Sequence, residues 1–172
     1  KDAPGSPLKD VRVRKAMELA LNIPALIDSG DFDSVDKQAT QIVPPSIFGY
    51  NSELKPVKQD VEKAKLLMKE AGYEKGFTLT FDTTNSQEKF QGKLKEQLAQ
   101  ISINLIVTQV TPDEAGFNKL ITGDTSMMIL SWFCPSGDAL EAYENVFGED
   151  ASFNIFKIND PEINDLLSNA KT

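Results

Sequence analysis

The residues with the richest side-chain chemistry lie in one short segment, Ser131 to Asp138. Trp132 offers a large, rigid apolar face with one N–H donor, which suits it to cover a solute at the mouth of a cleft. Phe133, Ser136 and Asp138 complete the candidate ligand-binding set in this segment. The alternative for Trp132 is that its ring fills the core at a strand end. The chemistry of this segment therefore indicates non-covalent binding.

Nothing in the sequence indicates catalysis or metal chemistry. Cys134 is the single cysteine, so no internal disulfide can form, and no Lys or Arg lies beside it to lower the pKa of its thiol. The chain has no histidine, which removes the usual zinc or nickel ligands and the commonest general base. The 26 acidic residues include no pair whose spacing selects a general acid and base. We therefore expect no cofactor, no metal and no enzymatic activity.

Two of the polar candidates also fit a role at the start of a helix. Asp138 and Glu141 have capping-box spacing, so Asp138 could be a helix N-cap as well as a ligand group. Asn85 is the other candidate ligand-binding residue, and it forms the same pattern with Glu88. Both readings stay open for these two side chains.

Hydrophobic periodicity predicts the elements that position these residues. Phe77–Phe81 alternates at the strand period, Ile103–Val110 is rich in β-branched residues, and Met127–Leu130 is a short apolar run. Helical patterns at 86–101 and 113–122 separate these strands. Strands joined by helical crossovers pair in parallel. The sequence thus predicts one α/β domain over residues 1–172, with a mostly parallel sheet and flanking helices.

In open α/β sheets the ligand crevice lies beyond the carboxyl ends of the strands. That rule selects three strand-end segments, Asp82–Asn85, Thr111–Asp113 and Ser131–Asp138. No Lys or Arg occurs from residue 82 to residue 87, so the first segment has no evident clamp for a ligand carboxylate.

Three aspartates are predicted to begin further helices. Asp10 and Asp60 each precede an apolar stripe, and Gly72 is placed to end the second of these helices. Asp160 precedes Pro161, and a short helix is expected from residue 25 to residue 29. The helix at 113–122 is predicted to bury Phe117, Leu120 and Ile121. The helix after Pro161 is predicted to bury Ile163, Leu166 and Leu167.

Composition limits the partners. The net charge of −8 and the absence of a basic cluster argue against nucleic acid, whose binding depends on Lys and Arg. The chain shows neither the apolar core of a signal peptide at its start nor an apolar run of membrane-spanning length.

Three blocks, in order, resemble one protein family. They are Ser6–Ala16, the stretch from Pro44 through Gly72 to Phe77, and Asn154–Leu167. The middle block combines a Pro-Pro entry, an aromatic-Gly-aromatic-Asn turn, an Asp-capped helix ending in Ala-Gly-Tyr and a Gly-Phe lead into a strand. This series is similar to the extracytoplasmic solute-binding proteins of family 5, which deliver peptides, nickel or other solutes to ABC importers.

The resemblance implies a fold, a partner set and a location. Members are much longer than 172 residues, and the chain resembles only their carboxyl-terminal lobe, one half of a type II periplasmic-binding-protein-like fold. The expected function is capture of a small solute, expected to be a peptide, by closure against an amino-terminal lobe, followed by docking on the permease subunits. The expected location is extracytoplasmic, in the periplasm or as a cell-surface lipoprotein. The alternative is a sensory or regulatory protein that reuses this lobe.

The resemblance also assigns roles within the candidate segment, and here the chain departs from the family. Similar proteins carry a W-x-x-D-x-x-D-P pattern in which the tryptophan and the first carboxylate line the ligand site. Counting from Trp132, Pro135 stands at the first Asp position, Asp138 at the second and Ala139 at the final Pro. A buried ammonium without a counter-charge is costly. We therefore expect recognition by stacking and backbone hydrogen bonds, with a longer or blocked peptide or an uncharged solute.

Overall fold

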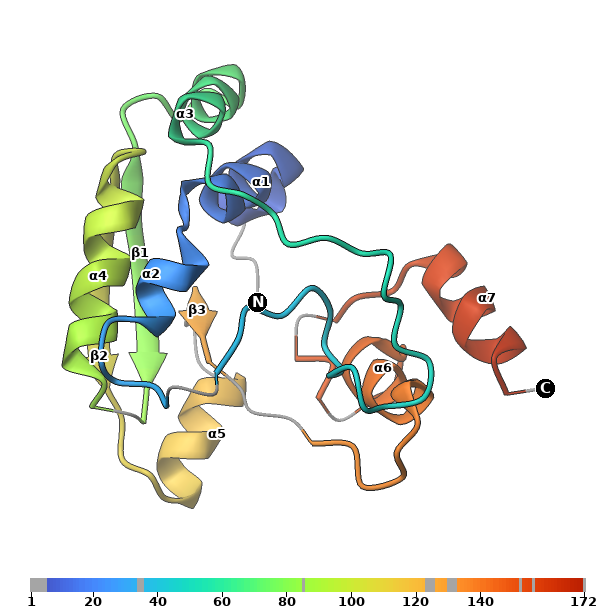
Figure 1. Ribbon diagram of the computed structural model, residues 1–172. Helices are drawn as coiled ribbons and strands as arrows, with labels where there is room; N and C mark the ends of the chain where they lie inside the picture. Colours follow the sequence, from blue (N-terminus) through green and yellow to red (C-terminus); the bar gives the residue numbers. More distant parts are fainter. Residues whose placement is uncertain are drawn as a thin grey trace. The chain divides into compact units, whose positions relative to one another are not determined.

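The computed structural model divides the chain into two compact units (Figure 1). It describes residues 6–33, 36–84, 86–122, 126–129, 133–151, 153–155 and 157–171. The sheet unit consists of Asp2–Gln38 and Val57–Ile129, and the helical unit consists of Lys1, Ala39–Pro56 and Leu130–Thr172. No described helix is long and apolar enough to cross a membrane.

The sheet unit contains three parallel strands in the order β2-β1-β3. They are β1 (Phe77–Thr83), β2 (Ile103–Gln109) and β3 (Met127–Met128). Phe77 lies opposite Ile103 at the start of the β1–β2 register. This arrangement confirms the predicted α/β class and the parallel pairing of all three strands.

Strand β1 is longer than its hydrophobic alternation predicted. The sequence placed Asp82 and Thr83 in a loop, but both belong to β1 and are only 7% and 5% exposed. Backbone pairing explains the difference, because the ladder with β2 continues through Asp82 opposite Thr108. The amide of Val110 then donates to the carbonyl of Thr83 over 2.9 Å.

Helix α4 (Glu88–Ala99) joins β1 to β2, and its start corrects a predicted cap. The N-cap residue is Gln87, so the capping box expected from Asn85 and Glu88 is wrong. The backbone amide of Phe90, in the first turn of α4, donates instead to the carboxylate of Asp31 over 2.8 Å. A side chain far away in sequence thus replaces the local cap.

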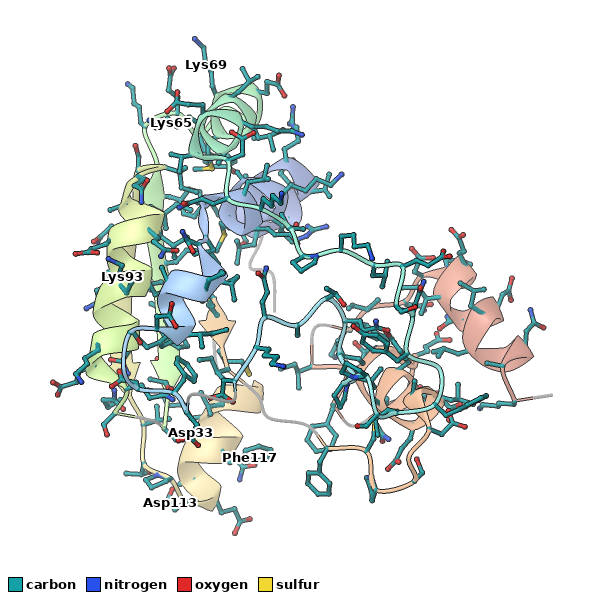
Figure 2. All side chains as sticks on the ribbon, in the orientation of Figure 1. Asp33, Lys65, Lys69, Lys93, Asp113 and Phe117 are labelled. Carbon is teal, nitrogen blue, oxygen red and sulfur yellow. The ribbon has the colours of Figure 1, made fainter. Side chains whose placement is uncertain are left out.

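Helix α5 (Glu114–Thr122) joins β2 to β3 and buries a different face from the one predicted. Leu120 is buried as expected, but Phe117 is 41% exposed. The buried line runs through Gly116 and Leu120, four residues apart, because the Gly116 backbone lies against the carbonyl of Thr111. A Cβ at Gly116 would lie 1.7 Å from that oxygen. This close approach turns Phe117 outward (Figure 2).

The core of the sheet unit lies between one face of the sheet and four helices. These helices are α1 (Val11–Ala20), α2 (Ile23–Ile27), α3 (Val61–Glu70) and α4. A 3-10 turn, Pro7–Lys9, precedes α1. The fully buried side chains include Val13, Met68, Phe81, Leu94, Leu98 and Ile103.

Helix caps in this unit follow the sequence closely. Asp10 and Asp60 accept backbone N–H groups at the starts of α1 and α3, and Gly72 leaves α3 with φ of +83°, as predicted. Helix α2 begins earlier than expected, with Asn22 as its N-cap. Arg12 lowers the pKa of the Asp10 carboxyl to about 2 by hydrogen bonding, and it also donates to the carbonyl of Glu70. That second bond ties the start of α1 to the end of α3.

The helical unit contains α6 (Ala139–Phe147) and α7 (Pro161–Asn169). Its small core consists of Val43, Ala139 and Ala142, with partly buried Ile47, Tyr50, Cys134 and Tyr143 packed around it. Asp160 begins α7 as predicted. Leu166, however, is 63% exposed, contrary to the prediction. Ile163 and Leu167, four residues apart, are half buried, and Leu166 lies off that line.

Candidate functional site

Three of the five predicted binding residues lie in the part of the chain that the structure describes. Phe133, Ser136 and Asp138 belong to the helical unit, whereas Trp132 and Asn85 fall outside the described residues. The roles of all five therefore remain predictions, and the geometry of the three described side chains can be built from their contacts.

Phe133 is presented to solvent by a tight turn. Its side chain is 80% exposed, the most exposed of the large apolar side chains in the described ranges. The following residue, Cys134, is half buried, and its carbonyl accepts the amide of Gly137 over 3.1 Å. Gly137 has a φ of +75°, which favours glycine at the turn. The turn that follows Phe133 thus holds the backbone next to this exposed ring.

Ser136 and Asp138 are held by a local hydrogen-bond network. The amide and hydroxyl of Ser136 both donate to the carboxylate of Glu141. The amide of Asp138 donates to the Ser136 hydroxyl over 3.2 Å, and its own Oδ1 accepts the amide of Leu140 over 2.9 Å. Asp138 is therefore the N-cap of α6. Glu141 bonds to Ser136, which precedes the cap, instead of closing a reciprocal capping box.

The cap gives a first prediction. Replacement of Asp138 by alanine should lower the free energy of unfolding by about 1 kcal/mol, because the Leu140 amide loses its acceptor. Asparagine at the same position keeps a side-chain oxygen and should change stability by a few tenths of that value at most. Urea denaturation of the two variants measures the difference. Equal losses for both would show that the charge, and not the cap, matters.

A short bridge attaches a second exposed aromatic residue to this segment. The amide of Phe48 donates to the carbonyl of Gly137 over 3.0 Å, and the amide of Ala139 donates to the carbonyl of Phe48 over 2.9 Å. Phe48 is 78% exposed. Gly49 has a φ of +87°, and its Cβ would lie 3.0 Å from the Cβ of Ala139. Two solvent-facing rings are thus anchored to the same loop.

In the second strand-end segment, after β2, the hydrogen bonds of Asp113 stabilise the start of α5. Asp113 accepts the amide of Gly116 and the hydroxyl of Thr111, each over 2.8 Å. These hydrogen bonds, the amide first, lower the pKa of the Asp113 carboxyl. Asp113 therefore begins α5, at the position marked in Figure 2.

The strand end of β1 holds a residue that the sequence did not single out. Asp82 is a largely buried residue in the central strand of the sheet, paired with Thr108 and Met128. Its carboxylate oxygens are not among the buried side-chain atoms that lack a partner in the described part of the chain. Strand alternation in the sequence ends at Phe81, so the sequence predicts a loop at Asp82.

Two hollows that open to solvent lie away from the carboxyl ends of the strands. One, of about 580 Å³, lies between α2 and α4, and the other, of about 320 Å³, lies beside the start of β2. Lys93 lines the larger hollow and pairs with Glu96 over 3.1 Å (Figure 2). Neither hollow includes a predicted binding residue. The described residues also contain no group of three or more Cys, Asp or Glu side chains placed to hold a metal.

Comparison with known proteins identifies the family. The family described as bacterial extracellular solute-binding proteins, family 5 Middle, matches residues 3–154. The glutathione-binding protein GsiB of Escherichia coli K12 is 31% identical over 95% of this chain and 34% of its own length. The dipeptide-binding protein of the same strain is 28% identical over 85% of this chain and 28% of its own. The chain thus spans about a third of these relatives.

The fold comparison agrees. The periplasmic binding protein DppA of Helicobacter pylori, solved in complex with the peptide STSA, superposes with a TM-score of 0.84. It is 27% identical, and the match covers 96% of this chain and 32% of that protein. Together with the parallel sheet described above, these matches show that the chain belongs to the bacterial extracellular solute-binding proteins of family 5.

Proposed function

We propose that the chain is the carboxyl-terminal lobe of an extracytoplasmic binding protein that delivers peptides to an ABC importer. The observation that carries the proposal is the close structural match to a family member that holds a peptide. The names of the glutathione-binding and dipeptide-binding relatives support a peptide ligand. The role is capture and release, without chemical change of the solute.

The proposed mechanism is hinge closure. The ligand is trapped between this lobe and an amino-terminal lobe, and the closed form docks on the permease subunits. A ligand enclosed on both sides loses more solvent contact than one lobe can remove, so tight binding needs both lobes. The helical unit contributes aromatic contact area through Trp132 and Phe133. Ser136 and Asp138 are held in fixed orientations by Glu141 and the start of α6.

The proposal can be tested by native mass spectrometry. The two-lobed protein is purified from its host without added ligand and sprayed intact, and the bound species is then released and sequenced. We expect short peptides to co-purify. A sugar or another solute without peptide bonds would contradict the peptide assignment while leaving the binding role in place.

Trp132 provides the variant that tests the binding role. In the two-lobed protein, replacement of Trp132 by alanine should weaken peptide binding roughly tenfold or more, because one face of a large ring no longer covers the ligand. Isothermal titration with a peptide that co-purifies measures the change. Phe147→Ala, an aromatic change on α6, is the control and should leave affinity within about twofold. Unchanged affinity in Trp132→Ala would place the ring in the core.

A further inference from the structure

Strand β2 leaves one edge of the sheet unit open. The order β2-β1-β3 places β2 at the rim, and no described strand pairs with its outer side. Natural edge strands are protected against pairing by charged residues, prolines, bulges or shortness. Strand β2 has none of these features, because its seven residues carry no charge and no proline and pair with β1 in an unbroken register. Its outer edge is therefore able to pair with another strand.

The open edge also has exposed apolar surface and free space beside it. Ile106, in the middle of β2, is 48% exposed, and Asn104, two residues earlier, is exposed on the same face of the sheet. The hollow of about 320 Å³ lies beside the start of this strand. It is lined by residues 102–105 and by Lys95 and Ala99 of α4. A further strand thus has room next to β2.

Helix α4 presents a matching face beside the same edge. Glu88, Gly92, Lys95 and Ala99 follow one another at intervals of three or four residues and form one exposed stripe along the helix. Lys95 and Ala99 border the hollow, so this stripe faces the open side of β2. A Cβ at Gly92 would meet nothing within 4 Å. Neither Glu88 nor Lys95 forms an ion pair with a described residue.

We propose that two copies of the protein pair through the outer edges of β2 and form a dimer with twofold symmetry. The strand complements itself when the pairing is antiparallel and centred on Ile106. Ile106 of one copy then lies opposite Ile106 of the other, which removes two exposed apolar side chains from water. Asn104 of each copy lies opposite Thr108 of the other, so polar side chains meet on the same face.

The charges on α4 favour the same arrangement. Helix α4 packs against β2 on one face of the sheet (Figure 1). Strands lie about 4.8 Å apart, so two helices that each cover the outer two strands lie about 10 Å apart, the usual distance for packed helices. The two copies of α4 run antiparallel, which brings Glu88 of one copy toward Lys95 of the other. Opposite charges therefore meet across the axis, although the whole chain carries a net charge of −8.

The size of this interface predicts its strength. One strand pair and one helix face involve fewer residues than the about 20–30 a side of a stable protein–protein interface. We therefore expect a weak dimer that forms at a protein concentration on the order of 100 μM. The pairing involves no bound peptide, so the inference goes beyond the proposed function and is measured without ligand.

Single cysteines test the register in the two-lobed protein. Cys134, the single cysteine of this chain, is first replaced by serine. In Ile106→Cys the twofold axis brings the two cysteine Cα atoms to about 4.5–5.5 Å, within reach of a disulfide. Asn104→Cys is the matched control, because it is exposed on the same face of the same strand. Its two copies lie four residues out of register, roughly 14 Å apart, which is too far for a disulfide.

We expect mild oxidation at about 100 μM to yield at least about fivefold more covalent dimer from Ile106→Cys than from Asn104→Cys. Sedimentation of the unaltered protein from about 1 to about 500 μM should show a monomer–dimer equilibrium. Lys95→Glu should weaken this dimer about fivefold, because like charges then face each other. Addition of Glu88→Lys to that variant reverses both charges and should restore the dimer.

Three outcomes would overturn the inference. A monomer at every concentration would show that another part of the two-lobed protein covers the edge of β2. Equal cross-linking of Ile106→Cys and Asn104→Cys would show that the strands do not pair in this register. A dimer that is unchanged in Lys95→Glu would place the interface away from α4. Each of these results leaves the peptide-binding function untouched, because no peptide takes part in the measurement.

Discussion

Replacement of Phe81 by alanine is expected to lower the free energy of unfolding by about 3–5 kcal/mol. Phe81 is fully buried, with 0% of its surface exposed, and lies in the central strand of the sheet. It belongs to the cluster that joins β1 and β2 to α1, α3 and α4. The loss combines the transfer of the ring to water with a cavity that the packed helices cannot close. Because domains are stabilised by only about 5–15 kcal/mol, the variant should unfold at much lower urea concentration.

Phe48→Ala is the matched control for that experiment. It removes the same side chain from a position that is 78% exposed, so little apolar surface changes its environment. Its free energy of unfolding should change by about 0.5 kcal/mol or less. Circular dichroism in urea measures both variants. A loss for Phe81→Ala no greater than that for Phe48→Ala would mean that the described core is wrong.

The second large effect is expected for Gly76→Ala. Gly76 precedes β1 with φ of +74°, and a Cβ there would lie 1.8 Å from the carbonyl oxygen of Ser102, which precedes β2. The oxygen belongs to the backbone and the Cβ is fixed to it, so neither can rotate away and the two strand starts would have to separate. The positive φ alone costs about 1–2 kcal/mol. With the clash added, we expect a total loss of roughly 3 kcal/mol or more.

Gly72→Ala separates the clash from the backbone strain. Gly72 has φ of +83°, close to that of Gly76, but nothing lies within 4 Å of the position of its Cβ. Its loss should therefore be limited to about 1–2 kcal/mol. Thermal and urea unfolding of the two variants give the comparison. Equal losses would show that the approach of Gly76 to Ser102 does not constrain the sheet.

The sequence predicted those parts of the fold whose signals are local. Alternation marked β1, a run of β-branched residues marked β2, and the capping aspartates Asp10, Asp60 and Asp160 marked helix starts within one residue. Each of these signals acts over a few residues, because a side chain caps the turn beside it and alternation sets the face of its own strand.

The predictions were wrong where contacts between segments far apart in sequence determine a helix cap, a buried face or a strand end. Asp31 caps α4 from far away in sequence, which no local capping pattern can show. Close approach of Gly116 to Thr111 rotates α5 and exposes Phe117. Pairing with β2 carries β1 past Phe81, although the next residue is charged. In each case tertiary contact overrode a preference that was correct for an isolated segment.

The candidate site shows the same division. The strand-end rule selected three segments, and the aromatic and polar residues of Ser131–Asp138 then singled out the loop that carries Phe133, Ser136 and Asp138. The same reasoning placed Asp82 in the loop after the first strand, whereas its pairing with Thr108 makes it part of β1.

The central proposal, that this chain is a peptide-binding lobe, is tested most directly by NMR. The 172-residue chain is labelled with ¹⁵N and titrated to millimolar concentration with a peptide that co-purifies with the two-lobed protein, because one lobe should bind weakly. We expect the largest shift changes at Phe133–Asp138, the predicted binding segment, and little change at α3. No shift change, or changes confined to α3 and the hollow between α2 and α4, would contradict the claim.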